Sequence, residues 1–135
     1  MRYSIIALIT GGLFAFSSLS LAQSSTDRPK PRLIQLDHSA GASSDVFTGP
    51  PGTVTMHSGY MVLAPGRSVG KHSTKGNEEA VLVFAGKGEM KINGGPTFNL
   101  APYAIAYVPP MTEHDVVNTG SDTLRYVWLV AKAHF

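Results

Sequence analysis

The sequence predicts an all-β domain, either a sandwich or a barrel, and three observations support this. Outside the N-terminal segment, no window repeats its apolar residues with the period of a helix. Short runs of β-branched and apolar residues recur along the chain instead. Gly- and Pro-containing turns separate these runs, and Asn93-Gly94-Gly95-Pro96 is a strong hairpin signal. Such a pattern is typical of antiparallel strands packed around one core.

The expected elements follow in chain order. Residues 23–31 are polar and interrupted by proline, which predicts a flexible lead-in. Residues 38–52 are rich in Gly, Ser and Pro, which predicts a loop. The predicted strands are 32–37, 53–56, 59–63, 80–84, 89–92, 98–100, 104–108, 115–118 and 124–131. The domain organisation is therefore a lead-in with an N-terminal strand over 23–52 and a barrel domain over 53–135.

The first 22 residues do not belong to this domain. Arg2 precedes an apolar run from Ile5 to Leu21, and Ser20 and Ala22 are small residues at the positions that a cleavage site requires. The segment predicts a secretory signal peptide over 1–22 and export to the periplasm or beyond the cell. An uncleaved membrane anchor is the alternative, since the run is close in length to a membrane span, which is about 20 residues. After cleavage we expect no stable membrane anchor.

Composition excludes several kinds of site. The 135-residue chain has no cysteine, so disulfides, thiolate ligands and a cysteine nucleophile are absent. An exported domain this small then depends on its core, a metal or a partner subunit for stability. The formal net charge is only +2 at pH 7. Its one basic cluster, 28–32, is proline-interrupted and predicts a solvated tail, so we expect no nucleic-acid partner.

Two histidines and a carboxylate form the candidate functional site. His114, Val116 and Asn118 share one face of a predicted strand, and Glu79 shares a face with the valines at 81 and 83. His72 and Thr74 share a face in the same way if their segment is extended. If the strands close into a barrel, these faces can meet in its interior. His72, Glu79 and His114 would then suit a divalent Fe, Mn, Zn, Ni or Cu ion, which would offset the cost of a buried carboxylate. The alternative is that each is an ordinary surface or core residue.

The spacing around these residues resembles the two motifs of the cupin superfamily. The first motif, Gly-x5-His-x-His-x3,4-Glu-x6-Gly, is matched by Gly66, His72, Glu79 and Gly86. The second, Gly-x5-Pro-x-Gly-x2-His-x3-Asn, is matched by Pro109, His114 and Asn118. The resemblance covers about residues 60–130. It implies a small jelly-roll-like β-barrel (a double-stranded β-helix), a metal site, a small-molecule ligand or substrate, and a homodimer.

The chain departs from the motifs at three positions. Thr74 replaces the second histidine of the first motif, which leaves a three-ligand site of His72, Glu79 and His114. A hydroxyl is a poor ligand beside imidazole. Tyr103 and Met111 replace the two glycines of the second motif, where glycine would adopt positive φ easily.

Other residues are candidates for the site. His57 is the first choice for an additional ligand, ahead of His38 and His134, and Glu78 is the alternative to Glu79. The strand positions predict a pocket wall that draws on Tyr60, Met61, Thr74, Val81, Val83, Tyr107, Val116, Asn118 and Trp128. The pattern does not decide which tyrosine faces inward. Tyr60, Tyr107 or Glu78 would be available for proton transfer, and Arg125 is either a contact for an anionic substrate or a solvated residue.

Two functions remain open at this stage. One is an exported metalloenzyme of dioxygenase, isomerase or lyase type, in which the metal acts on a small oxygen-containing substrate. The other is a non-catalytic ligand-binding module with weak or no metal, which the loss of a histidine at Thr74 favours. A purely structural role is a third reading, and a buried Glu79 argues against it.

Overall fold

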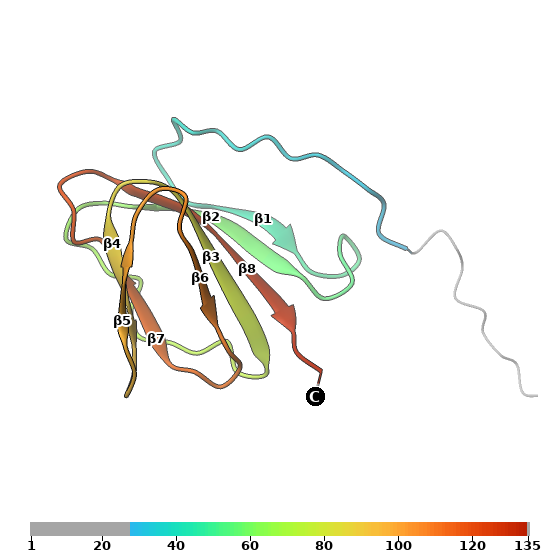
Figure 1. Ribbon diagram of the computed structural model, residues 1–135. Helices are drawn as coiled ribbons and strands as arrows, with labels where there is room; N and C mark the ends of the chain where they lie inside the picture. Colours follow the sequence, from blue (N-terminus) through green and yellow to red (C-terminus); the bar gives the residue numbers. More distant parts are fainter. Residues whose placement is uncertain (1–27, 135) are drawn as a thin grey trace, which may run out of the picture.

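The computed structural model describes residues 28–134, which contain eight β-strands and no helix (Figure 1). The strands are β1 (Ser44–Thr48), β2 (His57–Leu63), β3 (Asn77–Ala85), β4 (Gly88–Ile92), β5 (Thr97–Leu100), β6 (Ile105–Val108), β7 (His114–Val117) and β8 (Leu124–Lys132). The all-β prediction is therefore confirmed. The predicted signal peptide lies outside the described residues, among which no helix is long and apolar enough to cross a membrane.

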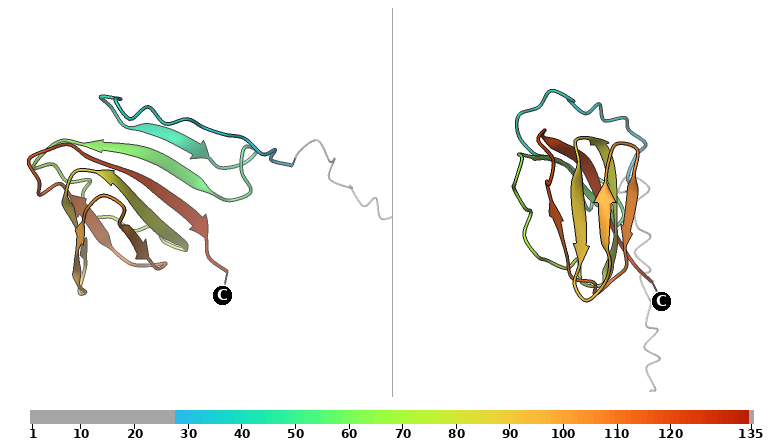
Figure 2. Two further views of the ribbon diagram at one scale, coloured as in Figure 1. Left: turned by 45° about the horizontal axis from the view of Figure 1, so that its top comes forward. Right: turned by 60° about the vertical axis from the view of Figure 1, so that its left-hand side comes forward.

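The strands form two antiparallel sheets that face each other. The larger sheet has the order β1-β2-β8-β3-β6, and the smaller has the order β5-β4-β7. Two further views show the long strands β2, β8 and β3 curving over the short strands of the smaller sheet (Figure 2). Sequential neighbours β3 and β4 thus lie in different sheets, so the chain passes from one layer to the other as it does in a jelly roll.

A segment outside the named strands extends the smaller sheet. Residues 66–72 run antiparallel to β7 and its flanks, with backbone bonds from Val69 N to Val116 O (3.0 Å) and from Asn118 N to Arg67 O (2.9 Å). The pairing ends at His72, which forms a bridge with His114. The smaller sheet therefore carries the two histidines side by side on its edge.

The interior between the sheets is filled by alternate residues of each strand. On β3 the buried positions are Glu79, Val81 and Val83, as their shared parity predicts. The cluster of buried hydrophobic residues draws on both sheets and comprises Leu63, Val81, Val83, Met90, Leu100, Ala106, Val108, Val116, Leu124 and Tyr126. Glu79 is thus a carboxylate at one end of an otherwise apolar interior face.

The N-terminal part of the fold differs from the prediction. Residues 32–37 form no strand, and Leu33 is 90% exposed. Residues 53–56 form no strand either, because this stretch lies in the bend that leads into β2. The first strand is instead β1, within the predicted loop, where Asp45 to Thr48 pair with β2. Its short β-branched and aromatic run outweighs the Gly- and Ser-rich residues before it.

Two turns of the second motif are built without glycine. Tyr103 has φ 69° and Met111 has φ 61°, which is the left-handed region that glycine enters without strain. Both backbone amides are held in place, with Tyr103 N donating to Val83 O and Met111 N donating to Lys75 O. The backbone therefore keeps the conformation of the motif although the glycines are gone.

Candidate metal centre

His72, Glu79 and His114 converge at one end of the barrel interior. Each contributes one ligand atom, and the three atoms lie within 4.8 Å of one another. Glu79 and His114 are buried, with 6% and 1% of their surface exposed, and His72 is half-buried. Three separate strand-like segments therefore place these side chains together, as the parity of the sequence predicts.

The two histidines are fixed by their backbones. His72 N donates to His114 O (2.9 Å), and His114 N donates to His72 O (2.8 Å). This reciprocal pair sets the imidazole rings with centroids 4.4 Å apart and planes tilted by 52°. The relative position of the two histidines is thus a property of the sheet.

Each imidazole is oriented to leave one nitrogen free. Nδ1 of His72 lies 2.8 Å from Gly70 O, and Nδ1 of His114 lies 3.2 Å from Thr112 O. Because a carbonyl only accepts hydrogen bonds, both Nδ1 atoms carry the proton as donors. Both Nε2 atoms then have a lone pair available. Backbone carbonyls orient metal-binding histidines in this way in many sites.

The Glu79 carboxylate has no adequate partner in the protein. Its Oε2 lies 3.2 Å from Nε2 of His114, yet neither atom makes a well-directed hydrogen bond to any residue between 28 and 134. The nearby Glu79 carboxylate raises the pKa of His114, while burial acts in the opposite direction. Two buried polar atoms that face each other without a proper bond are costly unless another group satisfies both.

A divalent cation fits this donor set. Two imidazole nitrogens and one carboxylate oxygen are ligands that Fe, Mn, Zn, Ni and Cu ions accept. Two atoms bound to one such ion at about 2.1 Å can lie at most about 4.2 Å apart. The observed limit of 4.8 Å is slightly wider. A small adjustment of the side chains would bring all three ligand atoms within reach of one ion, since His114 Nε2 and Glu79 Oε2 already lie 3.2 Å apart.

Thr74 does not replace the missing histidine. Its hydroxyl donates to Asn77 O (2.9 Å), and the Asn77 side-chain amide donates back to Thr74 O (2.9 Å). These bonds hold the turn before β3 and use the only donor of the threonine side chain. The residue lines the pocket without offering a ligand comparable to imidazole.

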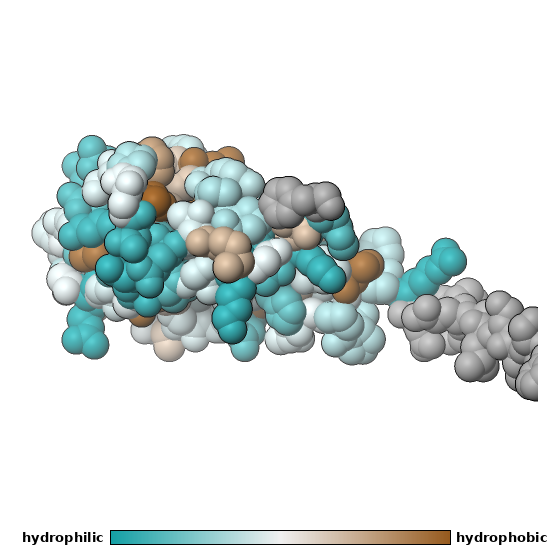
Figure 3. Space-filling model, turned by 90° about the horizontal axis from the view of Figure 1, so that it is seen from below, coloured by the Kyte–Doolittle hydropathy of each residue, from teal (hydrophilic) through white to brown (hydrophobic). Residues whose placement is uncertain are grey.

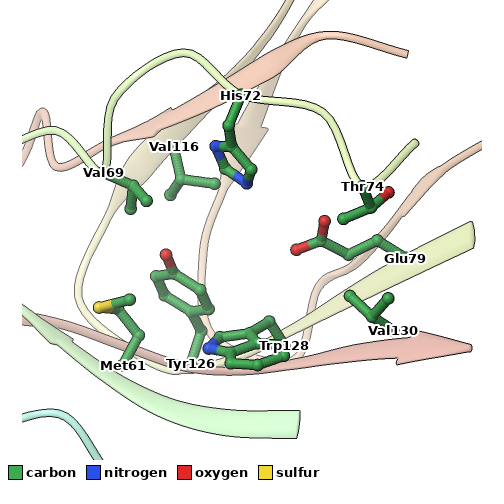
Figure 4. Close-up of a pocket in the computed structure, with 9 residues that line it drawn as sticks. All are labelled: Met61, Val69, His72, Thr74, Glu79, Val116, Tyr126, Trp128 and Val130. Atoms are coloured by element: carbon green, nitrogen blue, oxygen red, sulfur yellow. The ribbon is translucent and has the colours of Figure 1, made fainter. Parts of the chain in front are cut away.

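A cavity of about 320 Å³ adjoins the three side chains. Its walls come from both sheets and are mostly apolar, with His72, Thr74 and Glu79 along one side (Figure 4). The lining residues are Met61, Val69, His72, Thr74, Glu79, Val116, Tyr126, Trp128 and Val130. A cavity of this size suits a small organic ligand.

Several candidate pocket residues lie elsewhere. Tyr60 and Tyr107 are on the outer face of the larger sheet, where Arg125 donates to the Tyr60 hydroxyl (3.4 Å) and Tyr107 donates to Glu78 (3.2 Å). The prediction of these tyrosines as pocket walls or proton-transfer groups is wrong, because their strands present the neighbouring residues to the interior. Arg125 also donates to Ala40 O; it is half-buried and does not line the cavity.

Asn118 is buried but serves the fold. Its amide nitrogen donates to Leu63 O and to Asp122 O (both 2.8 Å), and its side-chain oxygen accepts from Gly120 N (2.9 Å). All its polar groups are thus occupied in holding the turn after β7. Asn118 does not line the cavity, in contrast to the prediction.

The other histidines are not part of the cluster. His57 is exposed at the start of β2, and its ring packs on Gly49, where an added Cβ would lie 2.6 Å from the imidazole. His38 and His134 are exposed. None of the three joins the group formed by His72, Glu79 and His114.

Three lining residues, Tyr126, Val69 and Val130, were not anticipated. Tyr126 is only 2% exposed and lies on β8 two residues before Trp128, whose side chain faces the same way. The parity of the strand would have identified it, since Trp128 was already expected in the pocket. Met61 and Val116 were also expected there, whereas Val69 and Val130 were not.

Comparison with known proteins identifies the family. The model of the cupin domain matches residues 59–130, which is more than half of the chain. The chain belongs to the cupin family. No curated protein sequence matches this cupin. The matched region runs from β2 to β8 and contains every member of the His72, Glu79 and His114 group.

Solved structures share the fold at low sequence identity. A cupin 2 conserved barrel domain protein from Salinispora arenicola is 20% identical, with a TM-score of 0.63 over 77% of this chain and 92% of that one. A predicted oxalate decarboxylase from Thermotoga maritima is 21% identical, with a TM-score of 0.63 over 67% and 79% of the two chains. The Cnp3 cupin domain of Schizosaccharomyces pombe is 20% identical (TM-score 0.61), and the alignment covers 67% of this cupin but only 64% of that chain. These likenesses support the double-stranded β-helix and nothing finer.

Proposed function

We propose that this cupin binds a divalent transition metal through His72, Glu79 and His114 and takes a small oxygen-containing molecule into the adjoining cavity. The observation that carries the proposal is the convergence of two free Nε2 lone pairs on a buried carboxylate that lacks a partner. A bound ion would satisfy all three groups at once. The structural neighbour from Thermotoga maritima, a predicted oxalate decarboxylase, would likewise act on an oxygen-rich small molecule.

The residues of the site would divide the work. His72 and His114 would hold the ion on the rigid edge of the smaller sheet, and Glu79 would complete a facial set of three. The ion would act as a Lewis acid toward substrate oxygens. The apolar walls would exclude water from the bound molecule, which strengthens electrostatic interactions inside the cavity. In this proposal the activity is of dioxygenase, isomerase or lyase type.

Metal analysis tests the proposal. Protein purified without chelator and then dialysed against Zn²⁺, Mn²⁺, Fe²⁺, Ni²⁺ or Cu²⁺ is expected to retain one ion per chain. His72→Ala and His114→Ala should each lose it, whereas His57→Ala should keep it. Substoichiometric metal in every preparation, with unchanged values in the histidine variants, would contradict the proposal.

A non-catalytic ligand-binding module is the second candidate function. The observation in its favour is Thr74, which occupies the position of the missing fourth ligand. Its hydroxyl donates a hydrogen bond to Asn77 O. A three-ligand ion is held less tightly, and the cavity could then bind its ligand with weak or no metal. Ligand affinity that is the same with and without metal would favour this candidate.

Export is part of the same proposal. The apolar run after Arg2 and the small residues around Ala22 support it. We expect the mature protein to begin at Gln23 and to be recovered from the periplasm or the medium. N-terminal sequencing of the protein expressed from its full coding sequence tests this. An intact Met1 in a membrane fraction would instead support the uncleaved anchor.

A homodimer is also proposed. The outer face of β8, β3 and β6 carries two apolar rows across neighbouring strands, Leu129-Ala80-Tyr107 and Val127-Leu82-Ile105. Ile105 is 70% exposed and Tyr107 is 56% exposed, and β6 is an edge strand. A second copy of the chain would cover this face and its edge. The face of the molecule that is seen from below carries hydrophilic side chains together with small groups of hydrophobic ones (Figure 3).

A further inference from the structure

Tyr126 presents an unused hydroxyl to the cavity. Only 2% of the surface of Tyr126 is exposed, and its ring packs in the hydrophobic core. Figure 4 shows the hydroxyl pointing into the cavity between Met61, Val69 and Val116. No hydrogen bond joins it to any residue in the described range 28–134, and it is not one of the fully enclosed polar atoms, so it is open to the cavity. Buried tyrosine hydroxyls usually have a partner, so this one is available to a ligand.

The indole of Trp128 adds a second free donor beside it. Trp128 lies on the same face of β8, and its ring rests on Gly59, where an added Cβ would be 2.6 Å from Nε1. Across the described part of the chain, the indole N–H also has no hydrogen-bond acceptor. An indole N–H can only donate. Both side chains form the floor of the cavity in Figure 4.

The Tyr126 hydroxyl remains a donor at ordinary pH. Burial raises the pKa of Tyr126, and the negative charges of Glu79 and Asp115 raise it further. The phenol is therefore protonated at neutral pH. The cavity thus has two polar regions with different chemistry: an ion-binding group at His72, Glu79 and His114, and neutral donors at Tyr126 and Trp128.

We infer that Tyr126 is a substrate-positioning residue that donates a hydrogen bond to an acceptor oxygen at the far end of the ligand. The inference rests on the proposed function, because the near end of the ligand is taken to meet the metal. The ligand class follows from the cavity. It is a small molecule with a carboxylate or other anionic oxygen at one end, a short apolar body and a carbonyl-type oxygen at the other. The apolar body matches the walls formed by Met61, Val69 and Val116.

Matched acids provide the test. The probes are 4-oxopentanoate and 5-oxohexanoate, each compared with the alkanoate of equal carbon number, pentanoate and hexanoate. Dissociation constants are measured by NMR titration of metal-free and Zn²⁺-loaded protein. The chain contains one tryptophan, so the single indole N–H signal reports directly from the cavity floor. The two chain lengths allow for the separation between the ion and the hydroxyl.

The expected result is a ketone preference that depends on Tyr126. At least one oxo acid should bind wild-type protein about fivefold more tightly than its matched alkanoate, the value of one neutral hydrogen bond. Tyr126→Phe should bring this ratio close to one. Tyr60→Phe, a tyrosine of the same sheet on its outer face, should retain the wild-type ratio.

The results that would overturn the role of Tyr126 differ from the result that would overturn the metal proposal, which is the absence of Zn²⁺ binding. A ratio near one in wild-type protein, a ratio unchanged in Tyr126→Phe, or no binding of any acid would each overturn the role of Tyr126. The wild-type ratio decides this even if a variant folds poorly. Zn²⁺ binding is measured separately by calorimetry. Zn²⁺ that binds normally while the ketone preference is absent rejects the role of Tyr126 alone.

Discussion

His72 and His114 exchange both backbone hydrogen bonds, and this pair of residues sets the geometry of the site. The distance between their rings is fixed by sheet pairing, and their Nδ1 atoms are each bound to a carbonyl two residues earlier. Glu79 comes from the opposite sheet. The site therefore joins the two sheets, and a bound ion would connect them.

Replacement of Glu79 by glutamine should affect the stability of the metal-bound protein but not lower that of the metal-free protein. In metal-free protein, Glu79→Gln removes a buried charge with no adequate partner, so the melting temperature should stay the same or rise. Wild-type protein should gain about 2.7 kcal/mol when free metal is 100 times Kd, and the variant should gain little. Thermal unfolding with and without Zn²⁺ measures both effects. Glu78→Gln is the control, because Glu78 bonds Tyr107 on the outer face. A large loss of apo stability in Glu79→Gln would contradict this account.

Thr74→His should restore a fourth ligand. The side chain faces the cavity beside Glu79, so an imidazole at this position can reach the same ion. We expect metal affinity to rise about tenfold or more, which equals about 1.4 kcal/mol. Calorimetric titration of metal-free protein measures it. Thr74→Val, which has the same shape but no hydroxyl, should not tighten binding. Equal affinities in Thr74→His and wild type would show that the three-ligand account is wrong.

Glycine at the two strained turns should stabilise the fold. Tyr103 and Met111 hold positive φ, yet 97% and 75% of their surfaces are exposed, so their side chains contribute little packing. The left-handed conformation costs about 1–2 kcal/mol for a residue with a Cβ, and glycine loses about 0.5–1 kcal/mol through its freer unfolded chain. Met111→Gly and Tyr103→Gly should therefore each gain about 0.5–1 kcal/mol. Chemical denaturation measures the gain. Met111→Ala, which keeps the strain, should show none.

Loss of the Asn118 side chain should destabilise the barrel strongly. The side-chain amide donates to Leu63 O and Asp122 O and accepts from Gly120 N, and Asn118 is 1% exposed. Asn118→Ala leaves these groups buried without partners and should cost about 2–3 kcal/mol. The exposed Asn93 is the matched control, and Asn93→Ala should change the unfolding free energy by less than about 0.5 kcal/mol. Equal effects of the two substitutions in urea unfolding would argue against a structural role for Asn118.

The proposed dimer should depend on the outer face of β6. Ile105→Lys places a charge at the β6 edge of the apolar rows and should shift sedimentation from dimer to monomer. Val54→Lys changes an apolar residue that is 75% exposed in the bend before β2, and it should leave the dimer intact. A wild-type protein that sediments only as monomer at working concentrations would contradict the proposal.

The sequence predicted the strands from β2 onward well because runs of β-branched and apolar residues alternate with turns that contain Gly or Pro. It also placed Glu79 with Val81 and Val83 on one face, and the structure confirms that face as buried. Parity predicts which residues share a face but not which face is inside. That is why Tyr60 and Tyr107 were expected in the pocket and lie outside it.

The remaining differences have local causes. Residues 32–37 alternate like a strand, but they find no neighbouring strand to pair with. The strand β1 was not predicted, since it lies in a segment whose glycines and serines predict a loop. It forms because it pairs with β2, which is a tertiary effect. Tyr126 could have been found from its parity with Trp128. Its unpaired hydroxyl could not, since that depends on what surrounds it in three dimensions.

The bridge between His72 and His114 also determines where the ion can be acquired. The two residues are separated in sequence by the whole of β3 to β6, so their pairing exists only after both sheets have assembled. An unfolded chain offers no preformed site, and the free energy of metal binding is then added to that of folding. If the chain crosses a membrane before it folds, as the proposed export implies, the metal supply of the destination compartment decides which ion the protein carries.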